Sequence, residues 1–302
     1  MNSWSGKTRG GICGYKIFVF LLRNVGISAA YFLLNFVALY YFFFSRKAFK
    51  YQYYLFHTIF GYSIAKAMLS VYRNFILLGQ TLIDKVCILS GTATHFTFDF
   101  EGEEHLRKIA KDGKGGILLN AHIGNWETAG QLLNRLSCNI NILLMDIEHE
   151  NIKRLLDQVM VVKSENTQVK IIVEKKDFSH LIEIKKTILN NEILVLHGDR
   201  FVPGMKVLST TFMDKKATFP YGPFFLAVRF GVPVSFVFAL KERKNHYHFF
   251  ATPAKVYTPA NSTITESDLL PILNDYTATL EKVLRKYPLQ WFNYYPFWEN
   301  QT

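Results

Sequence analysis

The sequence has little cysteine and no pattern that would use its cysteines in pairs. Only three occur in 302 residues, Cys13, Cys87 and Cys138, and they are widely spaced with no C-x-x-C pair. A disulfide-stapled secreted domain carries an even-numbered cysteine framework, and a zinc ribbon carries close cysteine pairs. The sequence therefore predicts that the protein resides in a reducing compartment. It also predicts that each of the three thiols is a small apolar side chain buried in the fold.

Metal-binding and phosphate-binding motifs are also missing. The histidines form neither H-E-x-x-H nor another zinc spacing, so we expect no metal and no cofactor. The glycine-rich run 111–116, K-D-G-K-G-G, lacks the Lys-Ser/Thr ending of a phosphate loop and precedes an apolar run, which predicts a solvated turn. The histidines that form no zinc-binding spacing are His95, His105, His180, His197, His246 and His248.

Acidic residues are few relative to basic ones. Lysine and arginine number 35 against 24 acidic residues, which gives a formal net charge of +11. This charge predicts an anionic partner: nucleic acid, anionic lipid headgroups or an acidic carrier protein. The chain also contains 27 Phe and 16 Tyr, many of them in the first ninety residues beside Lys and Arg. Segments at a membrane interface combine rings and cations in this way, so we expect an anionic membrane surface and no nucleic acid.

One long apolar run, Val25 to Phe44, is a candidate membrane segment. It is about long enough to cross a hydrocarbon core. It ends in Tyr-Phe-Phe-Phe without a small-residue cleavage site, which argues against a cleaved signal peptide. Basic residues flank it on both sides, so its topology stays open. Three interpretations remain: a spanning helix, a helix lying in one leaflet, and a buried core helix.

Hydrophobic periodicity changes along the chain and predicts an α/β fold. Apolar spacing over 51–85 predicts one amphipathic helix, and alternation from Thr92 to Phe100 predicts a strand that begins the core. Strands separated by helices indicate a mixed, largely parallel sheet flanked by helices. We therefore predict two regions, an N-terminal helical membrane anchor over 1–85 and an α/β domain over 86–302. After residue 100, the sequence predicts helices over 103–111, 125–136, 151–161, 178–189, 222–230 and 266–286, and strands over 116–121, 139–145, 169–173, 192–197, 232–240 and 247–252.

The segment Asn120 to Glu127 carries the most chemistry. His122 follows an apolar run and stands five positions before Glu127. On a regular helix five residues turn the chain through about 500°, so the two side chains would diverge. Gly124 and Asn125 favour a loop followed by a helix start, which lets both meet. Histidine ionises near neutrality, and a carboxylate on its other ring nitrogen strengthens it as a base. The sequence therefore predicts a His122/Glu127 catalytic dyad.

Several blocks, taken together, resemble the bacterial lipid A late acyltransferases, the lauroyl and myristoyl transferases of the lysophospholipid acyltransferase superfamily. Residues 120–127 are similar to the family's N-x-H-x-G-N-W-E block, and residues 100–106 to its E-G-x-E-H-L. Residues 288–298 resemble its closing P-x-Q-W/Y block. Asp199-Arg200 stands where members acting on lipid A usually carry Asp-Gln, and Asn293-Tyr294-Tyr295 replaces a basic run. These two departures concern the acceptor more than the chemistry.

The resemblance implies a glycerol-phosphate-acyltransferase-like core and no cofactor. It implies that His122 removes a proton from a hydroxyl or amine of a lipid acceptor, a lipid A precursor or an aminolipid, while Glu127 orients the ring. The acyl donor would be a thioester of acyl carrier protein or coenzyme A. Substrate-binding roles would fall to Gly124, Asn125, Asp199 and Arg200, with the oxyanion held by N–H groups near Gly124 and Asn125 or by the Arg200 guanidinium. The enzyme would sit on the cytoplasmic side of the inner membrane.

Other interpretations stay open. A lipid hydrolase would use the same dyad to activate water, and a membrane-associated scaffold would need no catalysis. An alternative role for Arg200 is a salt bridge to Asp214. An alternative role for Trp126 is packing beneath the loop. The aromatic segment 290–298 would pack on the core, touch the bilayer or form a closing strand.

Overall fold

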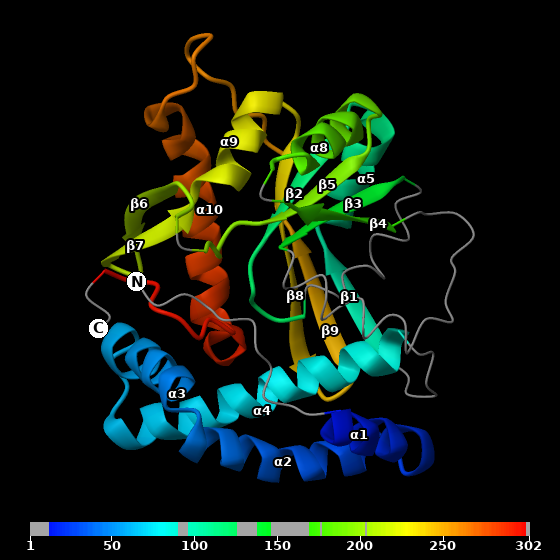
Figure 1. Ribbon diagram of the computed structural model, residues 1–302, viewed down its shortest axis with the longest axis vertical. Helices are drawn as coiled ribbons and strands as arrows, with labels where there is room; N and C mark the ends of the chain where they lie inside the picture. The colour runs from blue at the N-terminus through cyan, green and yellow to red at the C-terminus, as the bar shows by residue number, and fades with distance from the viewer. Residues whose placement is uncertain are drawn as a thin grey trace.

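The computed structural model describes residues 12–89, 96–125, 138–145, 169–175, 177–202 and 204–299. The N-terminal helices lie across one end of the central sheet (Figure 1). They are α1 (Ile12–Asn24), α2 (Ile27–Phe44), α3 (Arg46–Tyr53), a π-helical turn (Tyr54–Ile59) and α4 (Ile64–Leu89).

In the described part of the chain, seven strands form one sheet in the order β1-β9-β8-β2-β5-β3-β4. Neighbouring strands are parallel except β8 and β9, which are antiparallel. This is the mixed, largely parallel sheet that the sequence predicted. The strands are β1 (Thr97–Glu101), β2 (Gly116–Asn120), β3 (Ile140–Met145), β4 (Val169–Glu174), β5 (Ile193–His197), β8 (Val234–Arg243) and β9 (His246–Ala251).

Helices cover both faces of the sheet, and the central strand β2 is therefore buried along its whole length. Ile117 and Leu119 point into the core under α8 (His180–Leu189), α9 (Tyr221–Phe230) and α10 (Glu266–Lys286). Leu118 points to the opposite face, where α5 (Glu103–Asp112) packs. Strands buried on two faces read as continuous apolar runs, which is why β2 was recognisable in the sequence.

The N-terminal helices share the main core with the sheet. Leu55 and Phe56 belong to the same buried cluster as Leu119 and Trp291. The predicted division of the chain at residues 85 and 86 stays a prediction, and α4 itself runs through that point to Leu89. Burial of this kind ties the helices to the α/β region by the same hydrophobic effect that holds the sheet together.

Helix α2 buries one side and exposes the other. Ala30 and Leu34 are buried, and the Leu34 side chain fits against Gly79 of α4, where a Cβ would overlap it. Phe32, Phe36 and other rings on the far side are exposed. Among the described residues, α2 is the one helix whose length and apolar composition suffice to cross a membrane.

Most predicted elements after residue 100 coincide with observed ones within two or three residues at each end. Helix α10 matches its prediction at both ends, and at its N-terminus Thr265 and Asp268 form a capping box. Helix α5 ends at Gly113, which adopts the left-handed conformation of a C-cap. The predicted helix over 125–136 lies outside the described residues beyond Asn125, and so do Trp126 and Glu127. The predicted helix over 151–161 and the segment 90–95 before β1 also lie outside them.

Two features of the structure differ from the predictions. The single helix predicted over 51–85 is interrupted after the π-helical turn, where Gly61 has a φ of +67°. The hairpin of β6 (Val207–Phe212) and β7 (Lys215–Pro220) was missed. Its turn residues Met213 and Asp214 both have positive φ, but the pair lacks the Asn-Gly or Asp-Gly signal of such turns.

The C-terminal segment packs on the core. It passes through a 3₁₀ turn (Pro288–Gln290), and its aromatic side chains Trp291, Phe297 and Trp298 are buried. It forms isolated bridges rather than a strand, from Trp291 to Ile123 and from Trp298 to Ala217. Of the three interpretations of this segment, core packing is therefore confirmed.

Replacing Phe224 by Ala tests the packing of α9 on α10. Phe224 is fully buried, and its ring meets Tyr276 at 5.4 Å between centroids. We expect a loss of about 3–5 kcal/mol in the free energy of unfolding, because a cavity replaces the ring. Denaturant unfolding measures it. The control Leu189→Ala removes a side chain that is 69% exposed and should change stability by less than about 0.5 kcal/mol. Equal effects of the two substitutions would contradict this packing.

Candidate active site

The loop 121–125 after β2 carries the predicted catalytic residue His122 and the predicted substrate-binding residues Gly124 and Asn125 over the carboxyl end of the sheet. Gly124 has a φ of +67°, and a Cβ there would overlap the Ala239 carbonyl. Its N–H donates to the Gln290 carbonyl at 2.9 Å, and the Asn125 N–H donates to the Ala239 carbonyl at 2.7 Å. Gly124 is therefore needed for both the conformation and the close approach to β8.

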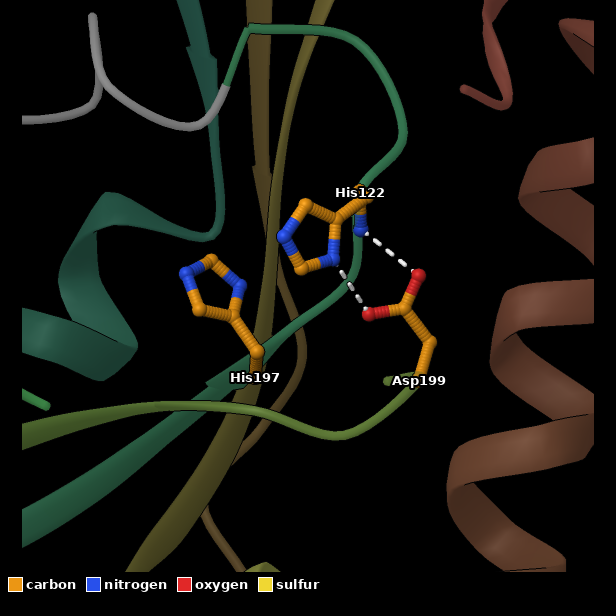
Figure 2. Close-up of side chains that lie close together, drawn as sticks. All are labelled: His122, His197 and Asp199. Carbon is orange, nitrogen blue, oxygen red and sulfur yellow. Dashed lines mark hydrogen bonds and ion pairs between the residues drawn. The ribbon is translucent and has the colours of Figure 1, made fainter. Parts of the chain in front are cut away.

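His122 and Asp199 form the centre of the site (Figure 2). The His122 backbone N–H donates to Asp199 Oδ2 at 2.8 Å, and its ring Nδ1 lies 2.8 Å from Oδ1. The residues are only 7% and 1% exposed. Because a carboxylate only accepts, Nδ1 carries the proton in this contact and Nε2 is the basic nitrogen of the neutral ring.

This contact changes the assignment of the carboxylate. The sequence predicted that Glu127 holds the ring, and it assigned Asp199 to substrate binding. In the described structure Asp199 makes the bond to Nδ1, because β5 pairs with β2 in the register Asn120 to His197 and so brings the two loops together. Glu127 lies outside the described residues, and its role stays a prediction.

The charge of Asp199 is stabilised despite its burial. Burial by itself raises the pKa of this carboxyl, but the charge and hydrogen bond of His122, with Arg200 and His197, lower the pKa below its usual range. Trp291 Nε1 lies 3.5 Å from Oδ2, and the Tyr295 hydroxyl donates to the Asp199 backbone carbonyl. The aromatic C-terminal segment thus closes over the carboxylate.

His197 is a site residue that the sequence reasoning missed. It is the last residue of β5, and its ring stacks on that of His122 with centroids 4.4 Å apart and planes at 29° (Figure 2). The sequence placed it at a strand end and considered it only as a metal ligand. Its position two residues before Asp199, at the carboxyl end of a buried strand, was the available signal.

The ligand atoms of His122, His197 and Asp199 lie within 4.8 Å of one another, which is the kind of cluster that can hold a metal. Imidazole lone pairs lie in the ring plane, so two stacked rings do not direct them at one ion. Nδ1 of His122 is moreover engaged with Asp199. The geometry suits a hydrogen-bonded base better than a zinc centre, and the absence of a metal stays a prediction.

Arg200 joins the site to the C-terminal segment. Its guanidinium donates to the Phe292 carbonyl at 2.9 Å, and the Phe292 N–H donates to the His122 carbonyl at 2.9 Å. Asp214, the alternative partner considered for Arg200, has a 93% exposed side chain and lies 3.7 Å from the Arg285 guanidinium.

In this conformation the hydrogen-bond donors of Gly124 and Asn125 bind other groups of the protein. Both backbone N–H groups donate to protein carbonyls, to Gln290 and Ala239, and their predicted role in holding an oxyanion stays a prediction. The Asn125 side-chain amide donates to the Thr81 carbonyl at 3.1 Å and to the Tyr247 hydroxyl at 3.2 Å. These bonds fix the loop that carries His122, while a substrate-binding role for the two residues stays a prediction.

Replacing Asp199 by Asn should destabilise the protein in a pH-dependent way. We expect a loss of about 1–3 kcal/mol at pH 7, because charged hydrogen bonds to His122 are weakened. The lowered pKa of Asp199 means that its contribution is complete above the unfolded value of about 4 and declines as the pH falls below it. Thermal unfolding measured from pH 7 to pH 3 should show that the stability difference between Asp199→Asn and wild type becomes smaller in acid.

The control for this experiment is Asp214→Asn, because the Asp214 ion pair is exposed and contributes little. It should unfold like the wild type at every pH. A gap between Asp199→Asn and wild type that stays constant down to pH 3 would contradict the charged state of Asp199.

Comparisons with known proteins extend these observations. No curated protein sequence matches the chain. Among solved structures, it is similar to the 1-acyl-sn-glycerophosphate acyltransferase PlsC of Thermotoga maritima, with 15% sequence identity, a TM-score of 0.39, and coverage of 86% of this chain and 99% of that one. The sequence matches the family described as bacterial lipid A biosynthesis acyltransferase over residues 8–299. Because this match spans nearly the whole chain, the protein belongs to the bacterial lipid A biosynthesis acyltransferase family and is an acyltransferase.

Proposed function

We propose that the protein transfers a fatty acyl chain from a thioester donor, acyl carrier protein or acyl-coenzyme A, to a hydroxyl or amine of a lipid acceptor. The acceptor is a lipid A precursor or an aminolipid, and His122 is the general base. The observation that carries this proposal is the buried contact of His122 Nδ1 with Asp199, since it leaves Nε2 as the basic nitrogen. Family membership supplies the class of reaction.

The reaction requires no covalent enzyme intermediate. Nε2 of His122 removes the proton of the acceptor group, whose oxygen or nitrogen attacks the thioester carbonyl carbon. The carbon–sulfur bond breaks, and the imidazolium returns the proton to the leaving thiolate. Asp199 stabilises the imidazolium between the two proton transfers, as the carboxylate does in hydrolase triads. Its buried position strengthens this attraction, because the local dielectric is low.

Glu127 and Arg200 complete the proposed site. Glu127 belongs to the predicted dyad and is proposed to act on the same imidazole, in addition to Asp199. Arg200 is proposed to bind the substrate and the developing oxyanion. Its guanidinium donates to the Phe292 carbonyl beside the His122 loop, and its positive charge acts on Asp199. This role gains support because the N–H groups of Gly124 and Asn125 donate to protein carbonyls.

The N-terminal helices are proposed to attach the enzyme to the cytoplasmic leaflet of the inner membrane. Exposed rings on α2 provide an apolar contact, and the net charge of +11 favours both anionic lipid and an acidic carrier protein. Helix α4, which packs along α2, exposes Lys66 and Arg73. A charged side chain at the bilayer centre costs about 2.5–3.5 kcal/mol, which favours helices lying in one leaflet over a spanning pair.

Replacing His122 by Ala tests the role of the base. We expect a loss of roughly a thousandfold or more in the rate of acyl transfer, because general-base catalysis and imidazolium stabilisation are both removed. Lipid mass spectrometry of cells that lack the protein and are complemented with each variant measures the outcome. Wild type should restore a lipid class heavier by one acyl chain, and His122→Ala should not.

His246→Ala is the matched control, because this histidine bonds Asp99 at the β1 edge of the sheet, away from the site. It should restore the lipid profile. Free fatty acid without acylated lipid would indicate a hydrolase instead, and full restoration by His122→Ala would indicate a scaffold.

A further inference from the structure

A buried ion pair lies beneath the catalytic loop, where α4 meets the sheet. Lys241 of β8 donates from Nζ to the carboxylate of Asp84 on α4, and both side chains are almost completely buried. Two tyrosine hydroxyls also donate to this carboxylate, Tyr31 from α2 and Tyr247 from β9. Lys241 donates further to the Tyr31 hydroxyl at 3.0 Å and to the Lys244 carbonyl at 2.6 Å.

The cluster is linked to the loop through Tyr247. Its hydroxyl donates to Asp84 and accepts from the Asn125 side-chain amide at 3.2 Å. The same amide reaches the Thr81 carbonyl, one helical turn before Asp84 on α4. Asn125 stands three residues after His122. Its hydrogen bonds therefore connect the loop to α4 and, through Tyr247, to the Asp84–Lys241 ion pair.

A second path connects Lys241 to the loop through its backbone. The Lys241 N–H donates to Gln290 Oε1 at 2.9 Å, and Gln290 Nε2 donates to the Lys241 carbonyl at 2.7 Å. The Gln290 carbonyl then accepts the Gly124 N–H at 2.9 Å. Gly124 and Asn125 are thus held from two directions by groups that converge on one residue of β8.

Stability alone does not account for a buried ion pair of this kind. Burial penalises both charges and by itself raises the pKa of Asp84, with Lys241 and the hydroxyl donors acting against that shift. Apolar side chains of similar volume usually hold a helix to a sheet as well or better. What directional hydrogen bonds add is a defined position for the groups that they meet, here the Asn125 amide.

We propose that Tyr247, held by the Asp84–Lys241 pair, is a positioning residue that sets the loop 121–125 and thereby the direction of the His122 ring. The N-terminal helices are then part of the catalytic unit as well as a membrane contact, because α4 supplies Asp84 and the Thr81 carbonyl. This inference rests on the proposed role of His122 as the base.

The test compares two single-hydroxyl deletions, Tyr247→Phe and Tyr31→Phe. Both remove one hydroxyl that donates to Asp84, but the partners of Tyr31 are Asp84, Lys241 and Lys244, whereas Tyr247 contacts Asn125. The donor is palmitoyl-acyl carrier protein, and the acceptor is vesicles of a total bacterial lipid extract. We expect Tyr247→Phe to lower kcat about tenfold or more with KM unchanged, since small misplacement of a catalytic group is costly. Tyr31→Phe should stay within about twofold of wild type.

A second measurement does not depend on activity. The rate at which diethyl pyrocarbonate modifies His122, read by peptide mass spectrometry, should change in Tyr247→Phe and not in Tyr31→Phe. If His122→Ala keeps full activity while this rate differs between the tyrosine variants, the proposed base is wrong and the positioning of the loop stands. Equal kcat and equal modification rates in the two variants would overturn the inference.

The double variant Asp84→Asn with Lys241→Met covers the case in which Tyr247→Phe fails to fold. It removes both charges together, so no unpaired charge remains buried. We expect it to unfold near the wild-type temperature and to show the same loss of kcat. Wild-type kcat in this variant would overturn the inference.

Discussion

The pairing of His122 with a buried carboxylate is the constraint on which the surrounding structure depends. A carboxylate at 1% exposure is tolerated only when charge and hydrogen bonds replace its lost hydration. Asp199 accepts two hydrogen bonds from His122, through the ring and the backbone N–H, and the charge of Arg200 also stabilises it. Because the two residues follow β2 and β5, the parallel register of these neighbouring strands is what allows the pairing.

The C-terminal segment completes that environment. Trp291 approaches the carboxylate, Phe292 binds both His122 and Arg200 through its backbone, and Gln290 binds Gly124. The aromatic cover lowers the local dielectric around the His122–Asp199 hydrogen bond, which strengthens its electrostatic attraction. This explains why the last residues of the domain are so rich in rings and why they follow an irregular path. Their hydrogen bonds go to the loop and Arg200, and also to α4 and β8, where Asn74 donates to the Trp291 carbonyl and Gln290 binds the Lys241 backbone.

The N-terminal helices and the sheet also form one physical unit. A shared apolar core and the Asp84–Lys241 contact join α4 to β8 directly below the loop. The apolar face of α2 points away from this contact, with Tyr31 turned inward to the carboxylate. A segment that reads in the sequence as a membrane anchor therefore also supplies polar groups to the base of the site.

The sequence by itself determined the elements and the chemistry of single residues. Apolar runs identified β2, the alternation of helical and extended segments identified α10, and the pattern around His122 identified the base, because these signals are local. Only the tertiary structure decided the partners. Asp199 bonds the ring nitrogen for which Glu127 was predicted, and His197 stacks on that ring, because strand register brings residues 77 and 75 positions away to one point. Such contacts are set by the order of strands in the sheet, which local periodicity does not encode.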